Sequence, residues 1–101
     1  MTRPRIQFLH FDGCPLADAA RAELELALAE CGIDTYEDID ILRASVPKEL
    51  RAWGSPTILV DGEDVSGERR PDEVACRIYD APGRVPRAAT IVSRIRSRRT
   101  S

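Results

Sequence analysis

The sequence has few of the residues that build disulfide frameworks and metal centres. Among 101 residues there are three cysteines and one histidine. Three cysteines cannot form the several bridges of a disulfide scaffold, and no Cys-x-x-Cys or Cys-His cluster is present to hold a structural zinc ion. No apolar run approaches the roughly 20 residues of a membrane span, and no signal-peptide-like apolar region follows the N-terminus. We therefore expect a cytoplasmic protein with no cofactor and no membrane partner.

The charged residues are unevenly distributed along a chain of ordinary composition. Apolar residues make up 43% and charged residues 32% of the sequence, which is typical of one globular domain. Residues 1–80 hold all 17 acidic and nine basic residues, a net charge of −8, whereas residues 81–101 hold six arginines and no acid, a net charge of +6. Such a basic segment could bind nucleic acid or an acidic membrane, or form a solvated helix face that complements the acidic body. No aromatic residue accompanies the arginines to stack on bases, so we expect no nucleic-acid partner.

A stretch near the N-terminus carries the main candidate for chemistry. Apolar residues over 6–11 predict a strand buried on both faces, and Asp12 and Gly13 then predict a tight turn. Pro15 suits the first position of a helix, which would place Cys14 at the helix N-terminus. Unpaired N–H groups and the helix dipole favour a thiolate there. The pattern predicts a reactive or metal-seeking thiol, and the alternative is a small cysteine that only packs.

The remaining patterns alternate between strands and helices. The first patterns predict a helix over 15–31 ended by Gly32, and then a strand over 35–41. A short helix capped by Ser45 and ending near Trp53 follows, and then a buried strand over 57–60. The last patterns predict a hairpin turn over 61–64 with a return strand from Val65, and helices opened by Pro71 and Pro86. A helix between the first two strands implies that they are parallel. Cys31 continues the apolar stripe of its helix, so we expect it in the core. From about Arg96 the chain is polar, and we expect it to fray over 96–101.

Two further residues have alternative interpretations. His10 lies four residues before Cys14 and could tune the thiol or act as a base, but a histidine in such a strand is more often packed and hydrogen-bonded. Cys76 could approach Cys14 as a second thiol, or it could pack within its helix. The sequence alone does not decide between these alternatives.

The order of the predicted elements, β-α-β-α-β-β-α-α, resembles the thioredoxin superfamily. The matching motifs are residues 8–15 as strand and active-site cysteine, residues 53–57 as the segment that carries a cis-proline, and Asp61-Gly62 as the following hairpin turn. The resemblance implies one α/β domain over 1–101, with a four-stranded mixed β-sheet flanked by helices. It also implies that Pro56 is cis and faces Cys14 across a shallow groove. Substrate contacts would then come from Pro15, Trp53, Ser55, Pro56 and Thr57.

The sequence also departs from this superfamily at its redox motif. The superfamily motif is Cys-x-x-Cys, whereas this chain has Cys14-Pro15-Leu16-Ala17 and lacks the resolving cysteine. It is also unlike monothiol glutaredoxins, which have glycine after the cysteine and a basic residue shortly before it. A glutathione-ligated iron–sulfur cluster is therefore disfavoured.

These features together predict a small thioredoxin-like protein with a single reactive thiol. Cys14 would form a mixed disulfide with a small thiol or a protein disulfide, and Cys76 would resolve it if it lies within reach. One alternative is a non-catalytic binding module that keeps the fold without the chemistry. A second is soft-metal, mercury-type binding by the thiolates of Cys14 and Cys76, because two thiolates suit a linear soft cation.

Overall fold

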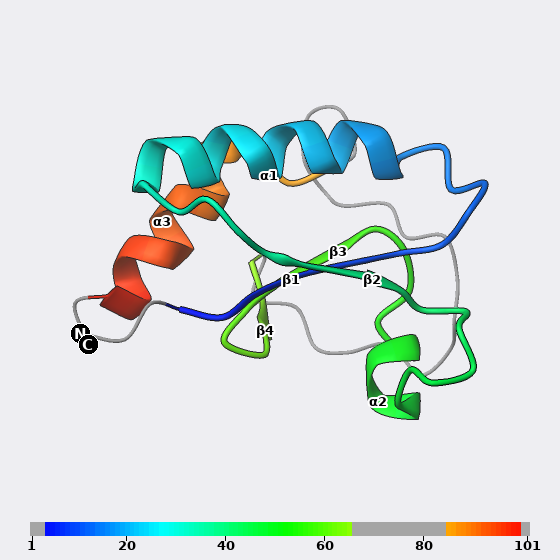
Figure 1. The fold of residues 1–101 in the computed structure, drawn as a ribbon. Helices are drawn as coiled ribbons and strands as arrows, with labels where there is room; N and C mark the ends of the chain where they lie inside the picture. Colours follow the sequence, from blue (N-terminus) through cyan, green and yellow to red (C-terminus); the bar gives the residue numbers. More distant parts are fainter. Residues whose placement is uncertain (1–3, 66–84, 100–101) are drawn as a thin grey trace.

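Four strands form one mixed sheet in the computed structural model, which describes residues 4–65 and 85–99 (Figure 1). The elements are β1 (Ile6–His10), α1 (Ala17–Cys31), β2 (Glu37–Asp40), α2 (Lys48–Arg51), β3 (Thr57–Val60), β4 (Glu63–Asp64) and α3 (Ala88–Arg99). The sheet order is β2-β1-β3-β4. β1 is parallel to β2 and antiparallel to β3, which is antiparallel to β4. The predicted α/β class, mixed four-stranded sheet and parallel first pair are confirmed. The helix predicted from Pro71, with Cys76, lies outside the described residues.

β1 lies in the middle of the sheet and is buried on both faces, as its sequence predicts. Ile6 and Phe8 point towards α1 and α3, which cover one face of the sheet (Figure 1). Leu9 points to the opposite face, where α2 lies, and packs with Ile41 and Leu59. Since alternate side chains of a strand point to opposite faces, a strand with apolar residues in both sets must be covered on both.

α1 packs on the sheet through the apolar stripe that its sequence predicts. The buried residues of the helix are Ala20, Leu24, Ala27, Leu28 and Cys31. Cys31 is 9% exposed, so its predicted place in the core is confirmed. Gly32 ends the helix with a φ of 71°, and the N–H of Ile33 donates to the carbonyl of Leu28 at 2.9 Å. This left-handed cap is the reason for a glycine at this position.

Several predicted boundaries differ from those observed, and the clearest differences lie at two helix starts and the hairpin turn. α1 begins at Ala17 rather than at Pro15, directly after the cysteine. Pro47, not Ser45, precedes α2, and the helix start has no side-chain cap, so the predicted role of Ser45 is wrong. The hairpin turn has two residues instead of four, with φ of 52° at Asp61 and 83° at Gly62. Positive φ at both positions marks a type I′ turn, which lets the return strand begin two residues earlier than predicted.

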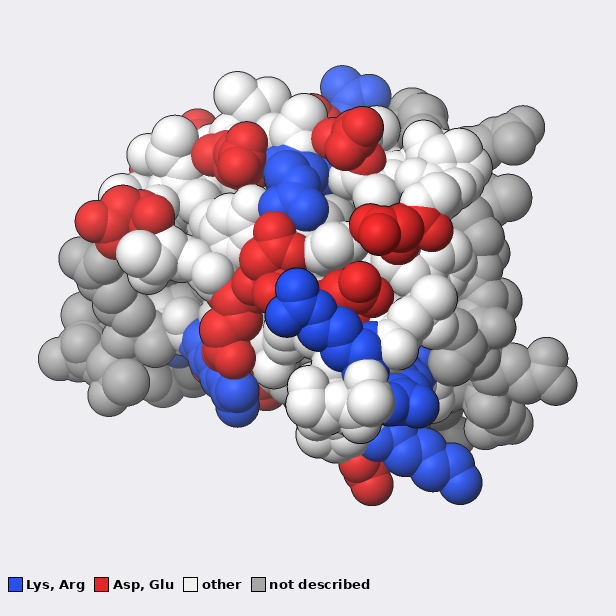
Figure 2. Space-filling model, turned by 45° about the vertical axis from the view of Figure 1, so that its right-hand side comes forward, with Lys and Arg blue, Asp and Glu red and all other residues white. Residues whose placement is uncertain are grey.

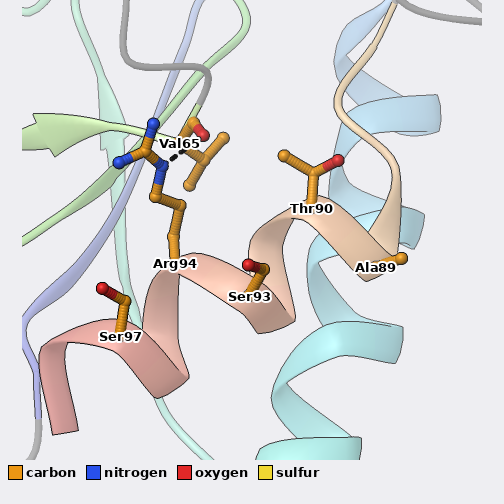
Figure 3. A pocket seen from close by; sticks show the side chains of 6 residues that line it. All are labelled: Val65, Ala89, Thr90, Ser93, Arg94 and Ser97. Atoms are coloured by element: carbon orange, nitrogen blue, oxygen red, sulfur yellow. Dashed lines mark hydrogen bonds between the residues drawn. The ribbon is translucent and has the colours of Figure 1, made fainter. Parts of the chain in front are cut away.

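α3 is tied to the body of the molecule by its arginines as well as by its apolar side. Ile91, Val92 and Ile95 are buried against the core. The guanidinium of Arg94 donates from Nε to the carbonyl of Val65 at 3.0 Å (Figure 3), and Arg98 contacts the carboxylate of Asp61 at 3.1 Å. The helix continues to Arg99, three residues past the point where we expected fraying to begin. None of the helices in the described ranges is long and apolar enough to cross a membrane.

Candidate functional site

Cys14 lies in the connection between β1 and α1, at the last position of a tight turn. Its backbone N–H donates to the carbonyl of Phe11 at 3.3 Å. Gly13, at the third position, has a φ of 85°, which is the conformation that a type II turn requires there. The carbonyl of Cys14 then accepts a hydrogen bond from the N–H of Ala17 at 3.3 Å, which closes a second turn before α1. Two consecutive turns therefore hold the cysteine backbone.

The helix-start prediction for Cys14 is wrong in its details. The first N–H that bonds four residues back at this end of α1 is that of Ala20, to the carbonyl of Leu16 at 3.0 Å. Cys14 therefore precedes the helix, and its own N–H is used within the Phe11 turn. The field of a helix dipole is concentrated at its first turn, so this position gains less from it than a cysteine at the N-cap. The residue is half-buried, and Pro15 beside it is exposed.

The cysteine turn is joined to the segment that enters β3. The N–H of Phe11 donates to Oγ of Ser55 at 3.3 Å, and the neighbouring Leu9 pairs with Thr57 across the antiparallel strands. The Ser55–Pro56 peptide bond is cis, as predicted. The structure therefore places the turn of Cys14 and the Ser55–Pro56 segment at the same end of the sheet, although they lie about 40 residues apart in the sequence.

Buried hydrogen bonds hold the loop that carries Pro56. The hydroxyl of Thr57 contacts the carbonyls of Trp53 and Gly54, both at 3.1 Å, so it can donate to either. Ser55, Pro56 and Thr57 are buried, whereas Trp53 is half-buried and packs, like Phe11, against the core cluster around Leu9. Of the predicted substrate contacts, Pro15 and Trp53 thus reach the surface, and the other three form the framework behind them.

His10 belongs to a polar cluster on the α1 face of the sheet. Its Nε2 bonds to the carboxylate of Asp38, and its ring stacks on Phe8 with centroids 5.3 Å apart. This arrangement matches the packed and hydrogen-bonded alternative for His10.

Arg21 is the centre of this cluster, and sequence patterns do not indicate it. Its guanidinium lies 4.7 Å from the ring centre of Phe8 and donates to the hydroxyl of Tyr36 at 2.9 Å and to Asp38 at 2.5 Å. Hydrogen bonding to Asp38 raises the pKa of Arg21. Burial acts to raise the pKa of Asp38, but hydrogen bonds from Arg21 and His10 outweigh it and lower the pKa. The strand register that places Asp38 opposite Phe8 would have been the only signal for this cluster.

A hollow of about 480 Å³ lies over α3 and is separate from these residues. It is lined by Val65, Ala89, Thr90, Ser93, Arg94 and Ser97 (Figure 3). None of the predicted site residues within 4–65 lines it. Across residues 4–65 and 85–99, no three His, Cys, Asp or Glu side chains are grouped so that they could hold a metal ion. Cys76 lies outside those ranges, and the prediction that it approaches Cys14 therefore lies outside the described residues as well.

Comparison with known proteins leaves the site to be interpreted from its own geometry. No protein-family model, curated protein or solved structure matches the chain. The arrangement offers one half-buried thiol in a double turn, beside an exposed proline, at the end of the sheet where the Ser55–Pro56 segment also lies. A thiol in such a place can react with a small or flexible partner that reaches the end of the sheet.

Proposed function

We propose that this chain is a thioredoxin-like protein that exchanges disulfides through the single thiol of Cys14. The observation that carries the proposal is the hydrogen bond that joins the cysteine turn to Ser55 at the entrance of β3. The four-stranded mixed sheet, with helices on both faces, also supports the proposal, because the sequence resemblance implies such a sheet.

The proposed exchange has two steps. The thiolate of Cys14 attacks one sulfur of a substrate disulfide, whose S–S bond breaks, and the released sulfur leaves as a thiolate that takes up a proton. A new S–S bond then links Cys14 to the substrate. A thiol of low molecular weight attacks the substrate sulfur of this mixed disulfide, restores the Cys14 thiolate and leaves joined to the substrate as a new disulfide. The exchange itself causes no net oxidation or reduction, and full reduction of the substrate needs a second equivalent of that thiol, so that two entering thiols supply the two electrons.

The residue at position 17 determines how the mixed disulfide is released. Ala17 occupies the position of the resolving cysteine, and its N–H lies 3.3 Å from the carbonyl of Cys14. Without a sulfur there, release depends on an external thiol or on Cys76. We therefore expect slow reduction of protein disulfides and accumulation of the mixed disulfide under mild oxidation.

The proposal is tested by treating the native protein with oxidised glutathione and measuring intact mass. The wild type and the Cys31→Ala variant should each gain one glutathionyl group, and Cys14→Ser should gain none. Repeating the experiment with Cys76→Ala, followed by added thiol, measures whether release needs the second cysteine. Equal modification of Cys14→Ser and wild type would refute the proposal, and a wild type that gains no group would leave the binding-module alternative.

A further inference from the structure

β2 forms an edge of the sheet, and part of its backbone faces outward. The N–H of Ile41 donates to the carbonyl of His10 at 2.8 Å, so this residue bonds towards β1. Successive peptide groups of a strand alternate in direction, so those of Asp38 and Asp40 face away from β1. Among the described residues, no strand pairs with this side of β2. Such an edge can accept an additional strand.

The edge has a net negative charge, although Arg5 pairs with Glu37 and Arg21 with Asp38. Residues 12–40 contain nine acidic residues and one basic residue, Arg21. Figure 2 shows acidic side chains spread over the upper and middle parts of one face, with some basic side chains among them and further basic side chains towards its lower edge. A second copy of β2 paired here would place aspartates opposite aspartates, and like charges directly opposite destabilise a strand pair. The charge therefore disfavours self-pairing and favours a cationic strand.

A groove beside the start of β2 adds a place for a side chain. Its volume is about 340 Å³, and it is lined by Glu25, Leu28, Ala29, Ile33, Asp34 and Tyr36. Leu28 and Ile33 are buried and supply apolar surface, while Glu25 and Asp34 supply carboxylates. Tyr36 shares a face of the chain with Asp38 because the two are separated by two positions. This combination suits a long side chain with a methylene stem and a cationic end.

We propose that the outer edge of β2 binds an extended segment, rich in lysine or arginine, from another protein. The segment adds to the sheet as a fifth strand through the peptide groups of Asp38 and Asp40. One of its cationic side chains lies in the groove, with its charge near Glu25 and Asp34. Backbone bonds then supply affinity, and the groove and acidic surroundings supply specificity. This site does not use Cys14, so it is independent of the proposed disulfide exchange.

The probe is a fluorescent peptide of alternating arginine and threonine, titrated into the full chain at low salt. It should bind and shift the amide signals of Asp38 and Asp40 in a nitrogen–proton NMR spectrum. A version methylated at alternate amide nitrogens should bind about tenfold more weakly, because two backbone hydrogen bonds are lost. The double change Glu25→Gln with Asp34→Asn should weaken binding up to about tenfold. The matched control, Asp12→Asn, removes a charge before the other end of α1 and should change affinity less than twofold, and Cys14→Ser should leave it unchanged.

Ala29→Phe provides a steric test, because Ala29 lines the groove and is exposed on α1. The larger side chain should fill the groove and weaken binding of the arginine peptide, and the NMR spectrum should show that the fold is unchanged. Equal binding of the methylated and unmethylated peptides would overturn the proposal, since it would show only diffuse attraction between charges. Failure of every peptide to bind would also overturn it and show that the acidic edge only prevents strand pairing. Concentration-dependent signal shifts at β2 without peptide would instead identify a second copy as the occupant and overturn the proposal too.

Discussion

The backbone N–H of Phe11 donates to the side-chain oxygen of Ser55, across 44 positions of the sequence. Because Phe11 also accepts the N–H of Cys14 through its carbonyl, a single residue connects the cysteine turn to the entrance of β3. The bond lies in a partly buried place, where an unsatisfied N–H is costly. Ser55 is therefore a structural residue of the candidate site.

Replacing Ser55 by alanine should destabilise the fold by about 1–2 kcal/mol, because it leaves the N–H of Phe11 without its acceptor. Urea unfolding measures this loss, and the rate of Cys14 alkylation in the folded protein should rise as the turn loosens. The matched control is Ser45→Ala, since Ser45 is exposed and α2 has no side-chain cap. Equal unfolding midpoints for the two variants would contradict a structural role for the Ser55 bond.

Gly13 should tolerate asparagine better than alanine. Its φ of 85° disfavours any side chain, and Gly13→Ala should cost about 1–2 kcal/mol. A Cβ added at this position would meet no atom within 4 Å, so the cost comes from backbone conformation and not from a clash. Asparagine accepts positive φ more readily, so Gly13→Asn should cost less. Thermal unfolding of the two variants tests this order, and an equal or greater loss for asparagine would contradict it.

Ala17→Cys should form a disulfide with Cys14. The N–H of Ala17 bonds to the carbonyl of Cys14, which gives a turn whose end Cα atoms lie within about 7 Å. That separation falls in the range of disulfides. The variant should lose one pair of titratable thiols on oxidation and should reduce insulin faster than the wild type. Ala22→Cys, exposed and more than one helical turn farther along α1, is the control and should show neither change.

Acid should destabilise the protein through three carboxyl groups whose pKa is lowered in the fold. A hydrogen bond from the side chain of Arg5 lowers the pKa of Glu37, and the backbone N–H of Arg5 lowers that of Asp61. The pKa of Asp38 is also lowered, because Arg21 and His10 outweigh its burial. At acidic pH the unfolded chain therefore binds more protons than the folded chain does. The stability that these carboxylates contribute is fully present above their unfolded pKa of about 4, and it is lost as the pH falls through their lower folded pKa values.

The variant Asp38→Asn should make this acid dependence shallower and should cost less than about 1 kcal/mol near neutral pH, because the ion pair is partly exposed. Urea unfolding between about pH 2 and pH 7 measures the slope. Asp12→Asn is the control, since Asp12 lies exposed in the cysteine turn. A slope for Asp38→Asn that equals that of wild type would show that the Arg21 cluster does not contribute to acid stability.

The sequence predicts the elements that follow from apolar periodicity and turn residues. β3 lies over the residues expected for it, and the apolar stripe of α1 runs down to Cys31 as expected, because burial imposes a regular spacing. The sequence predicts the start of α1 too early, because Pro15 fits a tight turn as well as the first helical position. Ser45 is a suitable cap by residue type alone, but the chain enters α2 at Pro47.

The cluster around Arg21 could not be predicted because it depends on distances through space. Its members come from separate parts of the chain, including β1, α1 and β2. The strand register decides which of them contact one another, and the sequence does not give that register. The same holds for the bond between Phe11 and Ser55. Periodicity indicates which face a residue lies on, but not which residue of another element stands opposite.

The antiparallel pairing of Leu9 with Thr57 has a consequence for the time course of folding. The end of β1 and the entrance of β3 meet only after a loop of nearly fifty residues has closed, and such closure is entropically slow compared with forming α1. A refolding chain should therefore keep Cys14 open to alkylation after helical circular dichroism has returned. Pulsed alkylation of this thiol at successive refolding times would therefore measure when β3 pairs with β1.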